Sequence, residues 1–314
     1  MFKKTLIAAA VATMASSVAM ADVKIGGKVE QQQQKSEAGE WSGWSDVRLT
    51  VSGDEDLGNG MSAFFKFQDE MGLRTGAGTQ QYDQLVGLKS SAGTLIMGKV
   101  EDFTESKVMS MTDKTMGAGG VEIGANLGRN EGAIAYVSPS FSGLTVGVAG
   151  YALSASGGDQ DAFDAVDLGL MYSNGPLSVN VAFENDKRAA TAATAATAAF
   201  DSGDSTSIGA SYAAGDLTVA ATQQMTSYDT AGKADEDDTS IAVTYNMGNN
   251  KVVVGWNDNE TSAGATVTDT NSNVIELQHS FSKTTAAYVQ FYNTDVAAGD
   301  TTSFGLQLDR KSVV

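Results

Sequence analysis

His279 is the side chain of this sequence best suited to acid-base chemistry, and it is the only histidine. Together with a serine and a carboxylate it could activate a nucleophile for hydrolysis. However, no G-x-S-x-G nucleophile elbow accompanies it. It alternates in step with Ile275, Leu277 and Phe281, just before an "SKTT" turn. We therefore expect an interfacial residue near the rim of a sheet, and we expect that the protein is not an enzyme.

Carboxylates are the most abundant chemical groups, with 38 Asp and Glu against 20 Lys and Arg. So many acids form close pairs by chance, and no spacing singles out a general acid and a general base. Two acidic stretches stand out, Asp235 to Asp238 ("DEDD") and residues 158–164 ("GDQDAFD"). Neither fits an EF-hand calcium loop. We expect a solvated acidic rim on external loops, with divalent-cation binding as the alternative; we predict no metal centre and no cofactor.

The stretch "DLGNGMSAFFKF", Asp56 to Phe67, indicates which elements carry the charged residues. Asn59-Gly60 is a strong signal for a type I′ hairpin turn, because both residues tolerate positive φ. Successive side chains of the strand that follows point to opposite faces. Phe65 and Phe67 therefore share an apolar face, whereas Lys66 lies on a polar face.

About sixteen segments of this alternating kind follow one another along the chain, and none has a helical period. Short turns between them, such as Asn174-Gly175-Pro176, interleave with longer loops, which is typical of a membrane β-barrel. Apart from the first 21 residues, no apolar run is long enough for a transmembrane helix. The chain has no cysteine and a formal net charge of -18. This acidity argues against nucleic acid as a partner.

Residues 1–21 carry two lysines, an apolar run and an Ala19-Met20-Ala21 cleavage signature, and they are predicted to be a secretory signal peptide. Export, with cleavage near Ala21, leaves a single domain at residues 22–314.

The sequence also resembles the Gram-negative general diffusion porins of proteobacteria. Five blocks carry the resemblance: "RLTVSGDEDLGNGMSAFFKF" from Arg48, "LVGLKSSAGTLIMGK" from Leu85, "RNEGAIAYVSPSFSGLTVG" from Arg129, "YSNGPLSVNVAFE" from Tyr172 and "HSFSKTTAAYVQFY" from His279. The resemblance implies an all-β, transmembrane antiparallel β-barrel of about 16 strands, with a long third loop folded into the lumen. It also implies a homotrimer in the outer membrane of a Gram-negative bacterium, in contact with lipid and lipopolysaccharide. The chain departs from the family at Tyr82 and Ala135, where arginine is common, and in ending with "DRKSVV" rather than an aromatic residue.

In such a barrel the first strands would present a pore-lining basic wall, formed by Lys24, Lys28, Arg48 and Lys66. The long loop would oppose it with five constriction-loop acids, namely Glu101, Asp102, Glu105, Asp113 and Glu122. Opposed charges across a narrow waist orient polar solutes and disfavour apolar ones.

The function predicted is passive diffusion of ions and small hydrophilic solutes, with weak cation selectivity. Three alternatives stay open from the sequence: a substrate-specific porin, a non-conducting surface barrel that acts through its acidic loops, and a soluble secreted β-sandwich.

Overall fold

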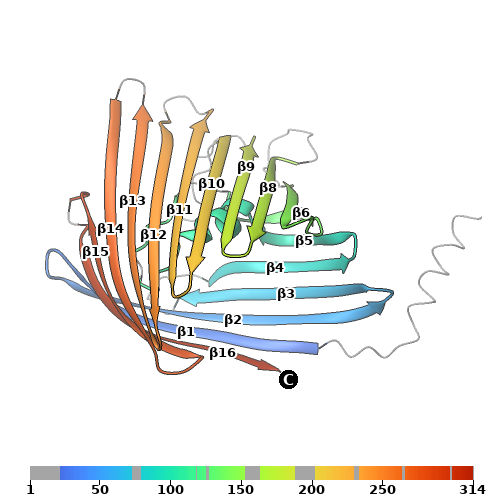
Figure 1. The fold of residues 1–314 in the computed structure, drawn as a ribbon, viewed down its shortest axis with the longest axis horizontal. Coiled ribbons are helices and arrows are strands. Elements are labelled where there is room, and N and C mark those ends of the chain that lie inside the picture. Colours follow the sequence, from blue (N-terminus) through green and yellow to red (C-terminus); the bar gives the residue numbers. More distant parts are fainter. Residues whose placement is uncertain are drawn as a thin grey trace, which may run out of the picture.

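The computed structural model describes residues 22–72, 79–117, 119–124, 127–152, 163–187, 202–229, 233–263, 266–297 and 299–313. Sixteen antiparallel strands close into a barrel in sequence order, and β16 returns to pair with β1 (Figure 1). This confirms the predicted fold class and strand number. The predicted signal peptide, residues 1–21, lies outside the described residues and stays a prediction.

The strands of the first half are β1 (Asp22–Ser36), β2 (Trp41–Gly58), β3 (Met61–Gly72), β4 (Thr79–Ser90), β5 (Gly93–Glu101), β6 (Arg129–Val137), β7 (Leu144–Tyr151) and β8 (Ala165–Asn174). Those of the second half are β9 (Leu177–Asp186), β10 (Gly203–Ala214), β11 (Leu217–Tyr228), β12 (Asp235–Met247), β13 (Asn250–Ala263), β14 (Thr266–Ser280), β15 (Thr285–Thr294) and β16 (Thr301–Val313). Residues 309–313 of the C-terminal stretch thus continue β16, in which Val313 pairs with Lys24 of β1.

The connections at one end of the barrel are short turns, as the sequence predicts. Asn59 and Gly60 have φ of 54° and 75°, the left-handed conformation that the Asn-Gly signal requires. At the other end, the prediction that longer loops join the strands is wrong for two connections. Only residues 37–40 separate β1 from β2, and only residues 264–265 separate β13 from β14. The reason is that polar residues extend the paired strands. Asp235 to Asp238, expected in a loop, belongs to β12, where Asp237 pairs with Glu260.

The two faces of the sheet differ in chemistry, and β14 shows this clearly. Ile275 and Leu277 are 56% and 49% exposed, whereas the intervening Glu276 is fully buried. Exposed apolar residues of this kind recur from β1 to β16. An apolar outer band with polar residues on the other face is the pattern of a lipid-embedded barrel. Among the described residues, no helix is both long and apolar enough to cross a bilayer.

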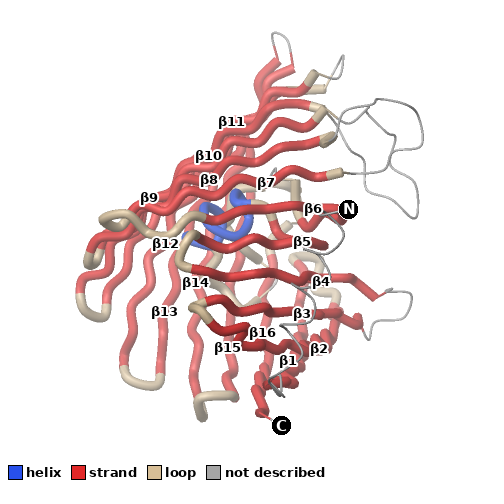
Figure 2. Tube along the Cα trace, turned by 90° about the vertical axis from the view of Figure 1, so that its right-hand side faces the viewer, coloured by secondary structure: helices blue, strands red, loops and turns tan. Residues whose placement is uncertain are grey.

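The connection between β5 and β6 is longer than any other connection between consecutive strands. Residues 102–128, hereafter the β5–β6 segment, contain a π-helical turn, η2 (Thr104–Val108), and a 3-10 turn, η3 (Met109–Met111), drawn in blue in Figure 2. These turns contact β8, β9, β10 and β11. The segment therefore packs against strands remote from β5 in the sequence.

Candidate functional site

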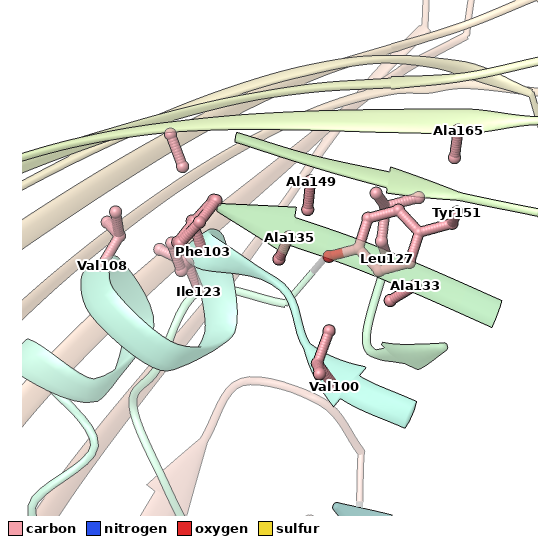
Figure 3. Close-up of a cluster of buried hydrophobic side chains, with 11 residues drawn as sticks. Val100, Phe103, Val108, Ile123, Leu127, Ala133, Ala135, Ala149, Tyr151 and Ala165 are labelled. Atoms are coloured by element: carbon pink, nitrogen blue, oxygen red, sulfur yellow. The ribbon is translucent and has the colours of Figure 1, made fainter. Parts of the chain in front are cut away.

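Both ends of the β5–β6 segment are fixed by apolar packing. Phe103, Val108 and Ile123 are buried in one cluster with alanines of β6, β7 and β8 (Figure 3). The ring of Phe103 lies over Gly147 and Gly169, where an added Cβ would come within 2.2 and 2.7 Å of ring carbons. Only glycine leaves room for the ring at these two positions.

Acidic side chains of the barrel wall hold the same segment by its backbone. Asp167 of β8 accepts a hydrogen bond from the N–H of Phe103 (2.6 Å), and Asp238 of β12 accepts one from Gly124 (2.9 Å). Glu184 of β9 accepts one from Leu127 (3.3 Å). These carboxylates therefore position the segment. The prediction of a solvated acidic rim does not include this role.

Glu276 and Gln290 hold the middle of the segment. Glu276, fully buried on β14, accepts hydrogen bonds from the backbone N–H groups of Met116 (2.8 Å) and Gly117 (2.9 Å). Its oxygens also accept from the side-chain amides of Gln278 and Gln290. Gln290 of β15 in turn accepts from the N–H of Gly119 and donates to its carbonyl. The segment thus reaches strands seven and six places away from β5 around the barrel.

Asp102 closes the base of the segment. It is fully buried, and its carboxylate accepts hydrogen bonds from the backbone N–H groups of Glu105 (2.6 Å) and Gly128. Burial raises the pKa of the Asp102 carboxyl well above its usual range, and the nearby charge of Glu184 acts in the same direction; the two backbone donors oppose the shift. Asp102 therefore joins the two ends of the segment.

The four residues of the predicted basic wall lie together and line a concavity of about 590 Å³ on the polar face. Each is ion-paired with a carboxylate of its own or a neighbouring strand. The pairs are Lys24 with Asp54 (3.0 Å), Lys28 with Glu30 (2.7 Å), Arg48 with Glu70, and Lys66 with Asp83 (2.6 Å). The wall is therefore largely neutralised at short range.

Arg129, at the start of β6, connects this wall to the segment and was not among the predicted site residues. It forms ion pairs with Glu101 and with Glu105 (2.7 Å). The Tyr82 ring lies between two guanidinium groups, 3.9 Å from that of Arg48 and 4.3 Å from that of Arg129. Two of the five predicted loop acids thus neutralise an arginine, while a tyrosine occupies a position where the family commonly carries arginine.

Among the described residues, the remaining predicted acids form no ion pair with Arg129. Asp113 is exposed on the segment beyond η3. Glu122 is half-buried near the end of the segment. The structure therefore brings Glu101 and Glu105 together on Arg129, but Asp102, Asp113 and Glu122 each have a different environment.

No arrangement for catalysis or metal binding is present in the described part of the chain. His279 is hydrogen-bonded through Nδ1 to Asn250 Oδ1 (2.8 Å) and packs edge-on against Phe281, as expected for a residue at the rim of the sheet. No group of three or more His, Asp or Glu residues within the described ranges could hold a metal ion. The acidic residues 158–162 lie outside those ranges.

Comparison with known proteins gives consistent results. The model of the Gram-negative porin family matches residues 8–299. The chain is 30% identical over 161 residues to an outer membrane porin protein of Bordetella pertussis, a match covering 44% of this chain and 41% of that protein. It is 27% identical over 192 residues to the major outer membrane protein P.IB of Neisseria meningitidis serogroup B, covering 56% and 57%. The matches thus span about half the length of these relatives.

Two solved structures share the fold over nearly the whole chain. The anion-selective porin from Comamonas acidovorans has a TM-score of 0.70 at 21% identity, with 94% of this chain and all of that chain covered. OmpF of Salmonella typhi has a TM-score of 0.73 at 15% identity, with 92% and 97% covered.

Proposed function

Because the chain belongs to the Gram-negative porin family, whose model matches residues 8–299, we propose that it forms an outer-membrane channel for passive diffusion of ions and small hydrophilic solutes. The family assignment agrees with the expectation that the chain is not an enzyme. One observation supports a channel most strongly: a closed sixteen-stranded barrel carries exposed apolar residues on one face and polar residues on the other. Sixteen strands leave space for an aqueous lumen.

The β5–β6 segment is proposed to cross this lumen as the constriction. Two observations support this placement. Its partners Asp167, Glu184, Asp238 and Glu276 all occupy buried positions, and the residues on either side of each in its strand are more exposed. Moreover, a chain that leaves β5 and hydrogen-bonds to β14 has to pass between opposite walls of a closed barrel.

Weak cation preference is proposed on the basis of charge pairing. The four bases of the wall each have a carboxylate partner, and Arg129 is paired with three, namely Glu101, Glu105 and, at 3.7 Å, Asp83. The formal net charge of the chain is -18, so a surplus of acids remains to concentrate cations at the mouth. This effect should weaken with salt, because the Debye length is about 8 Å at physiological ionic strength.

A homotrimer in contact with outer-membrane lipid and lipopolysaccharide is proposed as the working assembly. A structural neighbour, OmpT of Vibrio cholerae, is described in a trimer form. An apolar concavity of about 390 Å³ on the outer face of β2–β5, lined in part by Phe65, Val86 and Met97, is a suitable surface for a neighbouring copy. The predicted export and cleavage near Ala21 fit this location.

Planar-bilayer recordings test the proposal. Purified protein should give stepwise conductance, and the reversal potential across a tenfold KCl gradient should have the sign of weak cation selectivity, larger in dilute salt. A heat-stable barrel without conductance would favour the alternative of a surface barrel. Saturating inhibition by one sugar or organic acid alone would favour a substrate-specific porin.

A further inference from the structure

A cavity of about 290 Å³ lies between the β5–β6 segment and the polar face of β8–β11, close to the short turns. It is separate from the ion-paired wall of β1–β3. Four hydroxyl groups line its wall side, those of Ser173, Ser178, Ser211 and Thr218, and two lysines, Lys107 and Lys114, line its segment side.

The hydroxyl groups are placed by the register of the sheet. Ser173 of β8 is directly opposite Ser178 of β9, which in turn is directly opposite Ser211 of β10. Directly opposite residues of antiparallel strands share a face, and the two hydroxyls Ser173 Oγ and Ser178 Oγ lie 3.3 Å apart. Three small hydroxyl side chains therefore form a row across three strands. Their small size also leaves the cavity open.

The two lysines are held over this row by amide side chains of the wall. Asn180 of β9 donates to the carbonyl of Lys107 (2.7 Å), and Gln278 of β14 donates to that of Lys114 (3.1 Å). The Lys114 ammonium donates to the carbonyl of Ser110 (2.5 Å). In the described part of the chain, neither ammonium has an ion-pair partner within 4 Å. This distinguishes them from the four paired bases of the wall.

The lining favours one class of solute. It contains no carboxylate, so it does not suit a metal cation. Hydroxyl and ammonium groups are donors for an oxyanion, and hydrogen bonds with an ionised acceptor are about twice as strong as neutral ones. The cavity volume corresponds to roughly ten water molecules, at about 30 Å³ each, which is enough for a small oxyanion with part of its hydration shell.

We propose that this cavity is a binding site for a small oxyanion solute with the chemistry of inorganic phosphate, held by Lys107 and Lys114 against the Ser173–Ser178–Ser211 row. The proposal deepens the proposed function, because the anion would reach the site through the channel. A site of this kind retains an anion in transit, so it is compatible with weak cation preference of the open pore. Burial also lowers the pKa of Lys114, with the charge of Asp113 opposing the shift; a bound anion would favour the charged ammonium.

The test measures phosphate binding to the purified protein in two ways. The first is the ³¹P line width of inorganic phosphate titrated with protein in detergent micelles. The second is the reduction of KCl conductance by potassium phosphate at pH 7 in planar bilayers. We expect saturable broadening and saturable reduction of conductance. In the K107Q/K114Q variant the half-saturating phosphate concentration should rise about tenfold or more, as expected from loss of charge-assisted hydrogen bonds.

Three variants separate the site from general electrostatics. K283Q removes one positive charge from an exposed turn at the same end of the barrel. It should change the half-saturating phosphate concentration less than twofold. K107R/K114R keeps both charges and should retain binding, whereas S178A/S211A should weaken it several-fold. Wild-type broadening that does not saturate, or equal shifts in K283Q and K107Q/K114Q, would overturn the proposal. Because the line-width measurement needs no ion flow, phosphate binding without conductance would contradict the channel but support the site.

Discussion

The polar face of the barrel uses the same residue types in two different ways on its two sides. On β1–β6, carboxylates pair with basic side chains, as Glu70 does with Arg48 and Asp83 with Lys66. On β8–β15, carboxylates accept hydrogen bonds from the backbone of the β5–β6 segment, as Glu276 does from Met116 and Gly117. The first set determines the charge of the wall, and the second determines where the segment lies.

This difference implies that stability and ion selectivity should respond to different substitutions. Loss of a backbone-anchoring carboxylate leaves buried donors without partners, which is costly. Loss of a partly exposed ion pair costs little, but it changes the local charge.

The largest effect is expected for Glu276→Ala. The substitution removes the acceptor of two backbone N–H groups and two side-chain amides, so the free energy of unfolding should fall by about 3 kcal/mol. Urea unfolding in detergent micelles measures it. Glu260→Ala, a half-exposed carboxylate of β13, is the matched control and should cost about 0.5 kcal/mol or less. Equal losses for both variants would mean that the hydrogen bonds of Glu276 to the β5–β6 segment do not account for its contribution to stability.

A smaller loss, about 2 kcal/mol, is expected for Arg129→Gln, because Glu101 and Glu105 lose a charge-assisted partner. The same change should shift the reversal potential in a KCl gradient toward stronger cation selectivity. Arg129→Lys keeps the charge and should preserve selectivity while losing part of the stability, since an ammonium cannot reproduce the planar fork of a guanidinium. A Gln variant with unchanged reversal potential would mean that Arg129 lies away from the ion path.

A weaker effect is expected from pH through Asp102. Burial raises the pKa of this carboxyl in the folded protein, so folding favours its protonated form. Its contribution to stability is therefore complete below the usual pKa of Asp, about 3.9, and is lost as pH rises through the raised value. The thermal transition should accordingly fall as pH increases over this window, and Asp102→Asn should flatten the dependence. The control is Asp216→Asn, an exposed aspartate in the turn between β10 and β11. An equally flat profile in this variant would assign the effect to the overall charge of the protein.

The smallest effect is expected for Lys66→Gln. The side chains of Lys66 and Asp83 are 36% and 17% exposed, and partly exposed ion pairs contribute about 1 kcal/mol or less. Urea unfolding should therefore change little, while the reversal potential should move toward cations. A loss as large as that of Glu276→Ala would show that the wall has a structural role as well.

Much of the barrel could be predicted from local patterns. The alternation around Phe65, Lys66 and Phe67 indicated the faces, and Asn59-Gly60 indicated the turn. The residue pairs between neighbouring strands are harder to predict from the sequence, because a bulge near Leu57 shifts the register of β2 and β3 by one residue. Simple counting from the turn places Arg48 opposite Met71, whereas in the structure it pairs with Glu70.

The roles of the carboxylates could not be predicted, since they depend on contacts distant in sequence. Glu276 and Met116 are separated by 160 residues, and nothing in the spacing of either stretch indicates that they meet. For the same reason the sequence shows Tyr82 only as a departure from the family, although the guanidinium groups of Arg48 and Arg129 both lie against its ring. The sequence offers one signal that Tyr82 and Arg129 belong to the site: both occupy polar-face positions close to the first strands.

The central claim, that the β5–β6 segment lies in the ion path, is tested most directly by modifying single cysteines. The chain has no native cysteine, so Asp113→Cys on the segment and Val86→Cys on the outer face (58% exposed) each introduce one thiol. A charged methanethiosulfonate reagent added to open channels should change the conductance and the reversal potential of Asp113→Cys and leave both unchanged in Val86→Cys. Complete labelling of Asp113→Cys without any change in current would contradict the account.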